Sequence, residues 1–282
     1  MYVIHPIEKY INITDFISAI DVIRPKGFYF AGEMHNFWEI VFIKSGKATA
    51  TGDANIYNLS EGQLCFHKPM EFHRIWSTEN SEPHLNLLAF NATGKGMNKF
   101  ENMCFSLSAN DKEHFSTVFN FFTLSQKALN KFGKDSLEYQ TAMSKAASAL
   151  EVFLIWLIGK DSFFYEPVSA DEISYRKIVE IMNEHCEENL SVEQIASLCM
   201  MSRSNVKRVF AKYSDIGIAK YFLHLKIRRS MQLLDNGVSV SEVAYRLGFS
   251  EVSYFHTVFK RETGITPSQY KKHIAPEYKN IY

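Results

Sequence analysis

Cysteine and long apolar runs are both scarce in this chain of 282 residues, and each shortage excludes a class of protein. The four cysteines are far apart and form no Cys-x-x-Cys pair, so we expect neither a zinc site nor a disulfide framework. No run of about 20 apolar residues exists, so we expect no membrane span. The N-terminus lacks a basic region followed by an apolar stretch, so we expect no secretory signal and a cytoplasmic protein.

An excess of one charge is also missing overall, because 31 Lys and Arg residues balance 31 Asp and Glu residues. This balance hides an asymmetry, since residues 200–275 hold 13 basic and 5 acidic side chains, a net +8. The rest of the chain therefore carries −8. A basic region at one end of a chain is the electrostatic footprint expected of a domain that meets nucleic-acid phosphates. The alternative is a solvated basic surface.

Two kinds of pattern follow one another along the chain. Residues 22–90 contain short apolar runs separated by turns, which predicts a sandwich or barrel of strands. Residues 109–159 and 173–273 carry apolar side chains at helical spacing. We therefore expect an α+β protein with a β-barrel, a helical extension and an all-α C-terminal domain. The expected division is a first domain of residues 1–160, a linker of residues 161–172 and a second domain of residues 173–282.

The strongest pattern occurs twice near the C-terminal end. Residues 191–213 and residues 239–261 each contain a short amphipathic helix, a tight turn and a second helix with a polar, partly basic outer face. Ser202 and Ser250 are natural N-caps for the two second helices. This combination is how proteins place a helix in the DNA major groove. Two copies, joined by a helix over residues 218–234, predict two adjacent groove contacts.

The outer faces of the two second helices supply candidate DNA-contacting side chains. Lys and Arg on such a face can reach base acceptors or phosphates. For the basic residues, phosphate contact and a purely solubilising role both remain open. The outward positions are Ser204, Lys207, Arg208 and Ala211 in the first unit and Ser253, His256, Thr257 and Lys260 in the second, and Lys212 is a further candidate DNA contact.

The segment Val243–Tyr270, VAYRLGFSEVSYFHTVFKRETGITPSQY, resembles the second-unit signature of the AraC/XylS family of bacterial transcription regulators. The resemblance extends from Tyr175 to His273, with departures at Asp215 and Ser230. It implies a bihelical domain whose two recognition helices enter successive major grooves, with double-stranded DNA and RNA polymerase as partners. The base-contacting positions that it implies are Ser204, Asn205, Lys207 and Arg208, then Val252, Ser253, His256 and Thr257.

Within that family, the strand-rich front resembles a cupin-like ligand-binding barrel. His35 and Glu39 share one strand face, and His73 follows in a later strand, so these three residues are the predicted ligand-binding site. Two histidines and a carboxylate are a legitimate metal set. However, Phe37 replaces a histidine of the cupin pattern, so we expect no metal ion and no cofactor. A small organic effector, of which a sugar is one candidate class, is expected instead; a solid core or a partner-sensing domain is the alternative.

The predicted function is a sequence-specific, ligand-responsive transcription regulator with no catalytic residues. The alternative is a metal-dependent cupin-type enzyme with a DNA-binding appendage, and a third hypothesis is a DNA-binding protein without a ligand. The segment Leu150–Ile158 is more apolar than a surface helix needs. It predicts either a homodimer interface over residues of about 135–160, including Leu154 and Leu157, or packing against the chain's own barrel.

Overall fold

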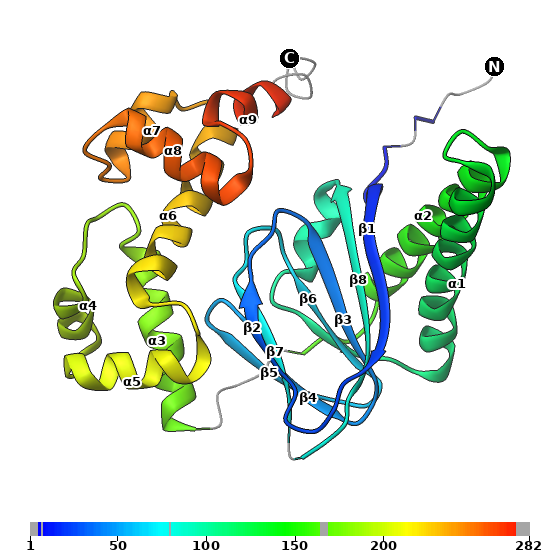
Figure 1. The fold of residues 1–282 in the computed structure, drawn as a ribbon, viewed down its shortest axis with the longest axis horizontal. Coiled ribbons are helices and arrows are strands. Elements are labelled where there is room, and N and C mark those ends of the chain that lie inside the picture. The colour runs from blue at the N-terminus through cyan, green and yellow to red at the C-terminus, as the bar shows by residue number, and fades with distance from the viewer. Residues whose placement is uncertain (1–4, 7, 79, 164–168, 275–282) are drawn as a thin grey trace. The chain divides into compact units, whose positions relative to one another are not determined.

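A computed structural model describes residues 5–6, 8–78, 80–163 and 169–274. Contacts divide the chain into two compact units, one of residues 1–30 and 36–166 and one of residues 31–35 and 167–282. Strand β2 (Tyr29–Glu33) is hydrogen-bonded into a sheet of the first unit, so it is described with that unit. Each unit is described by itself (Figure 1).

Two sheets form the first unit. The five-stranded sheet, whose neighbouring strands are all antiparallel, has the order β1-β8-β3-β6-β9, and the four-stranded sheet has the order β2-β7-β4-β5. The remaining strands are β1 (Asn12–Ile23), β3 (Trp38–Ser45), β4 (Lys47–Gly52), β5 (Asn55–Ser60), β6 (Gln63–His67), β7 (His73–Ser77), β8 (His84–Thr93) and β9 (Cys104–Ser106).

Alternation of side chains along β3 produces both cores of the first unit. Val41 and Ile43 point between the two sheets, where they pack with Ala48 of β4. Ile40 and Phe42 point to the opposite face of the five-stranded sheet and pack against helices α1 and α2. The two sheets therefore enclose one core, and the helices cover a second. This arrangement confirms the α+β class and the helical extension expected from the sequence.

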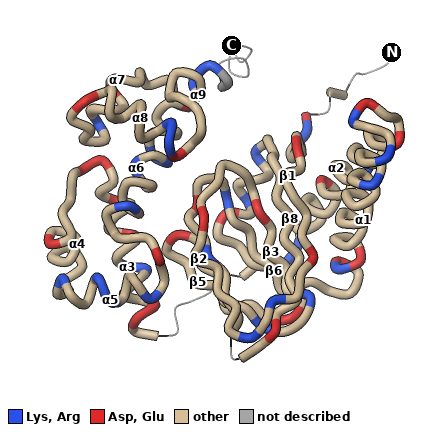
Figure 2. Tube along the Cα trace, viewed as in Figure 1, with Lys and Arg blue, Asp and Glu red and all other residues tan. Residues whose placement is uncertain are grey.

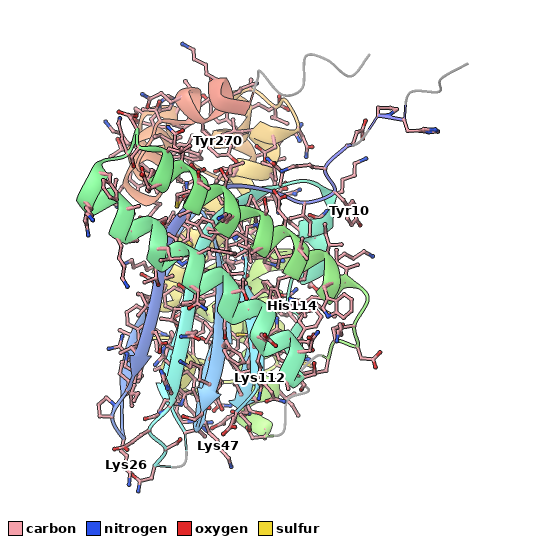
Figure 3. The ribbon with its side chains drawn as sticks, turned by 90° about the vertical axis from the view of Figure 1, so that its right-hand side faces the viewer. Tyr10, Lys26, Lys47, Lys112, His114 and Tyr270 are labelled. Carbon is pink, nitrogen blue, oxygen red and sulfur yellow. The ribbon has the colours of Figure 1, made fainter. Side chains whose placement is uncertain are left out.

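Helices α1 (Ala109–Phe132) and α2 (Leu137–Ile158) lie side by side across the five-stranded sheet (Figure 3). Asp111 closes a capping box with Ser108 at the start of α1 and accepts a hydrogen bond of 2.8 Å from Nε1 of Trp156. Burial alone would raise the pKa of Asp111, but hydrogen bonds from Ser108, Lys160 and Trp156 outweigh it and hold that pKa well below its usual range. This carboxylate therefore fastens the start of α1 to the end of α2.

The packing of α2 decides between the two roles expected of Leu154 and Leu157. Both are fully buried in the core of their own unit, so they pack against the barrel and do not form a dimer interface. Exposed large apolar side chains of α2 include Leu137 in its first turn and Val152, Ile155 and Trp156 near its end. Among the described helices, α2 alone is long and apolar enough to cross a membrane, although a buried core helix passes the same test.

The second unit consists of seven helices among the described residues. Ser169, Ser191, Ser202 and Ser239 each cap a helix through the side-chain oxygen. Ser250 does not cap α8 as expected, because the N-cap there is Glu251, without a side-chain cap. The helices are α3 (Ala170–Glu184), α4 (Val192–Cys199), α5 (Arg203–Tyr213), α6 (Ile218–Asp235), α7 (Val240–Arg246), α8 (Val252–Thr263) and α9 (Pro267–Ile274).

The expected linker of residues 161–172 is too long. Helix α3 already begins at Ala170, and Phe163 forms a β-bridge with Cys104 of β9. Residues 164–168, the centre of that expected linker, lie outside the described residues.

The pairing of β6 with β9 places Cys65 directly opposite Cys104, although the two residues are far apart in the sequence.

Candidate DNA-binding face and effector site

Helix α5 presents an apolar face to its own unit and a polar face to solvent. Val206 and Val209 are fully buried, while Ser204 and Lys207 are exposed. The helix begins after Ser202, whose Oγ accepts a hydrogen bond of 3.2 Å from the backbone N–H of Asn205. Because apolar residues recur at helical spacing, the predicted outward residues share one face. Figure 2 marks the Lys and Arg positions, in blue, along the trace of α5.

Two of these basic residues are already engaged within the second unit. Arg208 and Lys212 both donate to the carboxylate of Asp171, at 2.8 Å and 3.0 Å. Arg208 also donates to Oδ1 of Asn205. The hydrogen bonds from Arg208 and then Lys212 hold the pKa of Asp171 well below its usual range. Asp171 was not predicted from the sequence, because it lies on α3, outside both helix-turn-helix patterns.

Helix α8 supplies the second set of predicted positions. Ser253, Thr257 and Lys260 are exposed, while Val252 and His256 are half-buried. The hydroxyl of Thr257 donates a hydrogen bond of 3.1 Å to the backbone oxygen of Ser253, one turn earlier. The hydroxyl hydrogen of Thr257 is therefore used inside the helix, which leaves its oxygen and methyl group for contacts outside.

A buried lysine ties the two helix-turn-helix motifs together. Lys226 of α6 donates to the backbone oxygens of Glu188 and Leu247, both at 2.6 Å, and to Oδ1 of Asn189 at 3.0 Å. Asn189 in turn donates a hydrogen bond to the backbone oxygen of Gly248. A Cβ on Gly248 would lie 2.7 Å from the side chain of Asn189, so only glycine fits there. These bonds join the segment before α4 to the turn after α7. Lys226 thus stabilises the fold. Its charge was included in the +8 of residues 200–275, but the buried ammonium group is not part of the basic surface.

The structure brings the three predicted ligand-binding residues together. Nε2 of His73 lies 3.8 Å from Oε1 of Glu39, which shares the inward face of β3 with Val41. Glu33 and His35 complete a group of four whose potential ligand atoms all lie within 4.8 Å of one another. Two imidazoles and two carboxylates fit a divalent transition metal by donor chemistry. Phe37 therefore does not leave the donor set incomplete, because Glu33, which was not predicted from the sequence, supplies a fourth donor.

A second polar pair lies deeper in the same unit. The buried ring of His67 donates from Nδ1 to Oε2 of Glu71 at 2.7 Å, and it stacks on His73 with ring centroids 4.3 Å apart. Burial lowers the pKa of His67 to about 3, so this ring is neutral at physiological pH. Nδ1 of His73 donates a hydrogen bond of 3.0 Å to the backbone oxygen of Glu71. This bond orients Nε2 of His73 toward Glu39. His67 and Glu71 thus position His73.

Strand β4 makes room for these polar groups. Ala48 and Ala50 face the interior between the sheets, and Gly52 follows on the same face. A Cβ on Gly52 would fall 2.6 Å from Oε2 of Glu71. Small side chains along β4 therefore allow the carboxylate of Glu71 to reach His67.

Comparison with known proteins addresses both units. A model described as the AraC-like ligand binding domain matches residues 21–93, and a helix-turn-helix domain model matches residues 189–273. The chain belongs to the AraC family. It is 23% identical over 260 residues to the Msm operon regulatory protein of Streptococcus mutans, and the match covers 88% of this chain and 89% of that protein. It is 22% identical over 245 residues to the transcriptional activator RhaS of Enterobacter sp., and the match covers 84% of this chain and 86% of that protein.

Among solved structures, ToxT from Vibrio cholerae matches 97% of this chain and 100% of its own, with 16% identity and a TM-score of 0.40. This AraC-family chain is a transcription regulator with a ligand-binding and a DNA-binding domain. The ligand-domain match contains Glu39 and His73, and the helix-turn-helix match begins after α3 and so excludes Asp171.

Proposed function

We propose that this AraC-family regulator binds a small molecule in its front unit and thereby alters its binding to specific DNA or its activation of transcription. The observation that carries the proposal is the convergence of Glu39, His73, His35 and Glu33 in a domain matched by a ligand-binding family. Ligand sites in proteins combine apolar walls with a few convergent polar groups. The protein is proposed to act in the cytoplasm and to have no catalytic activity.

A sugar is the proposed effector class. Each sugar hydroxyl both donates and accepts a hydrogen bond, which matches carboxylates that accept and imidazoles that do either. The donor set also suits a divalent cation, so the effector screen needs a metal arm. Thermal denaturation of the full chain with a panel of saccharides, and separately with Mn²⁺, Fe²⁺, Ni²⁺ and Zn²⁺, distinguishes the two classes. Stoichiometric metal in the purified protein would instead favour the cupin-type enzyme.

For DNA, we propose that α5 and α8 enter successive major grooves. The supporting observation is that both helices bury their apolar faces and leave the predicted positions accessible. The proposed contacts are Ser204, Asn205, Lys207, Arg208, Lys212, Val252, Ser253, His256, Thr257 and Lys260, with RNA polymerase as a further partner.

Arg208→Ala tests base contact. Against a duplex selected by the wild type from a random pool, binding should weaken by about 1–3 kcal/mol, and preference at one base pair should relax. Equal losses on selected and scrambled duplexes would show that Arg208 contacts only phosphate.

We also propose a homodimer through the outward face of α2, in place of the buried positions first expected. Val152, Ile155 and Trp156 lie close together on α2 and are at least half exposed, and exposed apolar groups of this kind often mark protein contacts. The division into a sensor and dimerisation domain, a short linker and a DNA-binding domain remains part of this proposal.

A further inference from the structure

Asp171, in the first turn of α3, binds two cations of the proposed DNA-contacting face. Its Oδ1 accepts a hydrogen bond from Nη2 of Arg208 at 2.8 Å, and its Oδ2 accepts one from Nη1 at 3.1 Å. Oδ2 also accepts from Nζ of Lys212 at 3.0 Å. One carboxylate therefore neutralises two neighbouring cations on the outer face of α5.

These contacts occupy the donors that base recognition requires. A guanidinium has five N–H donors, and guanine is read by a bidentate pair of them. Asp171 accepts from two N–H donors of Arg208, and Oδ1 of Asn205 accepts from two more, on Nε at 3.2 Å and on Nη2 at 2.9 Å. Arg208 must therefore release Asp171 or Asn205 before it can read a base in bidentate fashion.

The position of Asp171 is set by the core of the second unit. Helix α3 begins with a capping box between Ser169 and Glu172, which leaves the carboxylate of Asp171 to face α5. One turn later, Tyr175 is fully buried, with its ring centroid 5.7 Å from that of Phe210 of α5. The carboxylate is thus held on a packed helix beside the two cations.

We propose that Asp171 is an internal competitor of DNA that lowers the affinity of the regulator by occupying Arg208 and Lys212. The inference rests on the proposed entry of α5 into the major groove. When DNA takes the two cations, the carboxylate of Asp171 is left near phosphates of like charge and takes up a cation from solution. Removing this charge should therefore tighten DNA binding, the opposite of the effect of most substitutions in a binding domain.

The test compares Asp171→Asn with the wild type, as full chains, on the selected duplex and on a scrambled duplex. Because exposed ion pairs contribute modestly, both duplexes should be bound about two- to tenfold more tightly at 0.1 M salt. The plot of log affinity against log salt concentration should be steeper for the variant by up to about one unit. In the wild type the freed carboxylate takes up a cation when DNA binds, and the variant has no carboxylate there to do so.

Glu187→Gln is the matched control. It removes the same charge from the second unit, but its partner at 2.8 Å is Arg229 of α6, which is not a proposed DNA contact. This variant should change DNA affinity less than twofold. Equal tightening in both variants would overturn the proposal, because it would reflect net charge alone.

The pathway of the effect is tested in a background of Arg208→Ala and Lys212→Ala. There, Asp171→Asn should tighten DNA binding clearly less than it does in the otherwise wild-type chain, because the two competed-for cations are gone and only the repulsion between the carboxylate and phosphates is relieved. Tightening of the same size in both backgrounds would overturn the proposal. Weaker binding of Asp171→Asn in the otherwise wild-type chain would also overturn it and would make Asp171 a positioning residue. Failure to select any duplex would count against the proposed function, whereas the scrambled-duplex comparison would still test Asp171.

Discussion

At the scale of single residues, Gly52 decides whether Glu71 can reach His67. We expect Gly52→Ala to lower the free energy of unfolding by about 1–3 kcal/mol, because the new Cβ would fall 2.6 Å from Oε2 of Glu71. The carboxylate is fully buried and bonded to His67 at 2.7 Å, so it cannot move aside without breaking that bond. Urea unfolding followed by circular dichroism measures the change.

Gly159→Ala is the matched control in the same unit. Its Cβ would meet only the backbone oxygen of Trp156, at an ordinary 3.7 Å, so stability should change by less than about 0.5 kcal/mol. Equal stability of the Gly52 variant and the wild type would mean that Glu71 moves freely, contrary to its role in orienting His73.

The polar cluster also shows which site residues a sequence can predict. Alternation along β3 placed Glu39 on the same face as Val41, so its inward direction was predictable. Glu71 was not, because it lies outside a regular strand, directly after Met70, which adopts the left-handed conformation at φ 60°. No periodicity indicates where such a side chain points.

At the scale of elements, the two faces of α2 predict opposite outcomes for the same chemical change. Leu157→Glu should lower the free energy of unfolding by more than about 3 kcal/mol, because it places a carboxylate in the core. Ile155→Glu should leave thermal stability nearly unchanged and weaken the proposed dimer, because Ile155 is 52% exposed. Thermal denaturation and sedimentation velocity at micromolar concentration measure the two effects.

A dimer that survives Ile155→Glu would move the interface to another surface. A strictly monomeric wild type at the same concentration would remove the dimer altogether. If Leu157→Glu remained stably folded, the buried position of this leucine in the core would be wrong.

Elements defined by local chemistry were predicted better than elements defined by distant pairing. The helix expected over residues 218–234 is α6, which spans Ile218–Asp235, because its apolar spacing lies within one segment. Strand β1 was not expected, although its 12 residues pair with β8 along most of their length. That pairing joins Asn12 to Thr93, and no local signal specifies a contact between residues so far apart.

At the scale of the whole molecule, the net charge of a region overstates the cations available to DNA. Residues 200–275 carry +8, yet Lys226 is buried in the fold and Arg208 and Lys212 share the carboxylate of Asp171. Asp171 itself lies outside the residues counted. The sequence therefore predicted the location of the basic surface but not which of its charges are engaged internally.

The regulator as a whole should couple its two sites. An effector changes DNA affinity only through a difference in its own affinity for the two protein states, and the coupling is reciprocal, typically about 1–3 kcal/mol. With an effector found by thermal denaturation, we expect His35→Ala or Glu39→Ala to abolish the change in DNA affinity while preserving DNA binding without effector. Fluorescence anisotropy of the selected duplex, titrated with and without effector, measures both quantities. Glu138→Ala, on α2 and away from this cluster, is the control and should respond as the wild type does. A normal response in both site variants would place the effector elsewhere, and loss of folding in both would make His35 and Glu39 structural groups of the core.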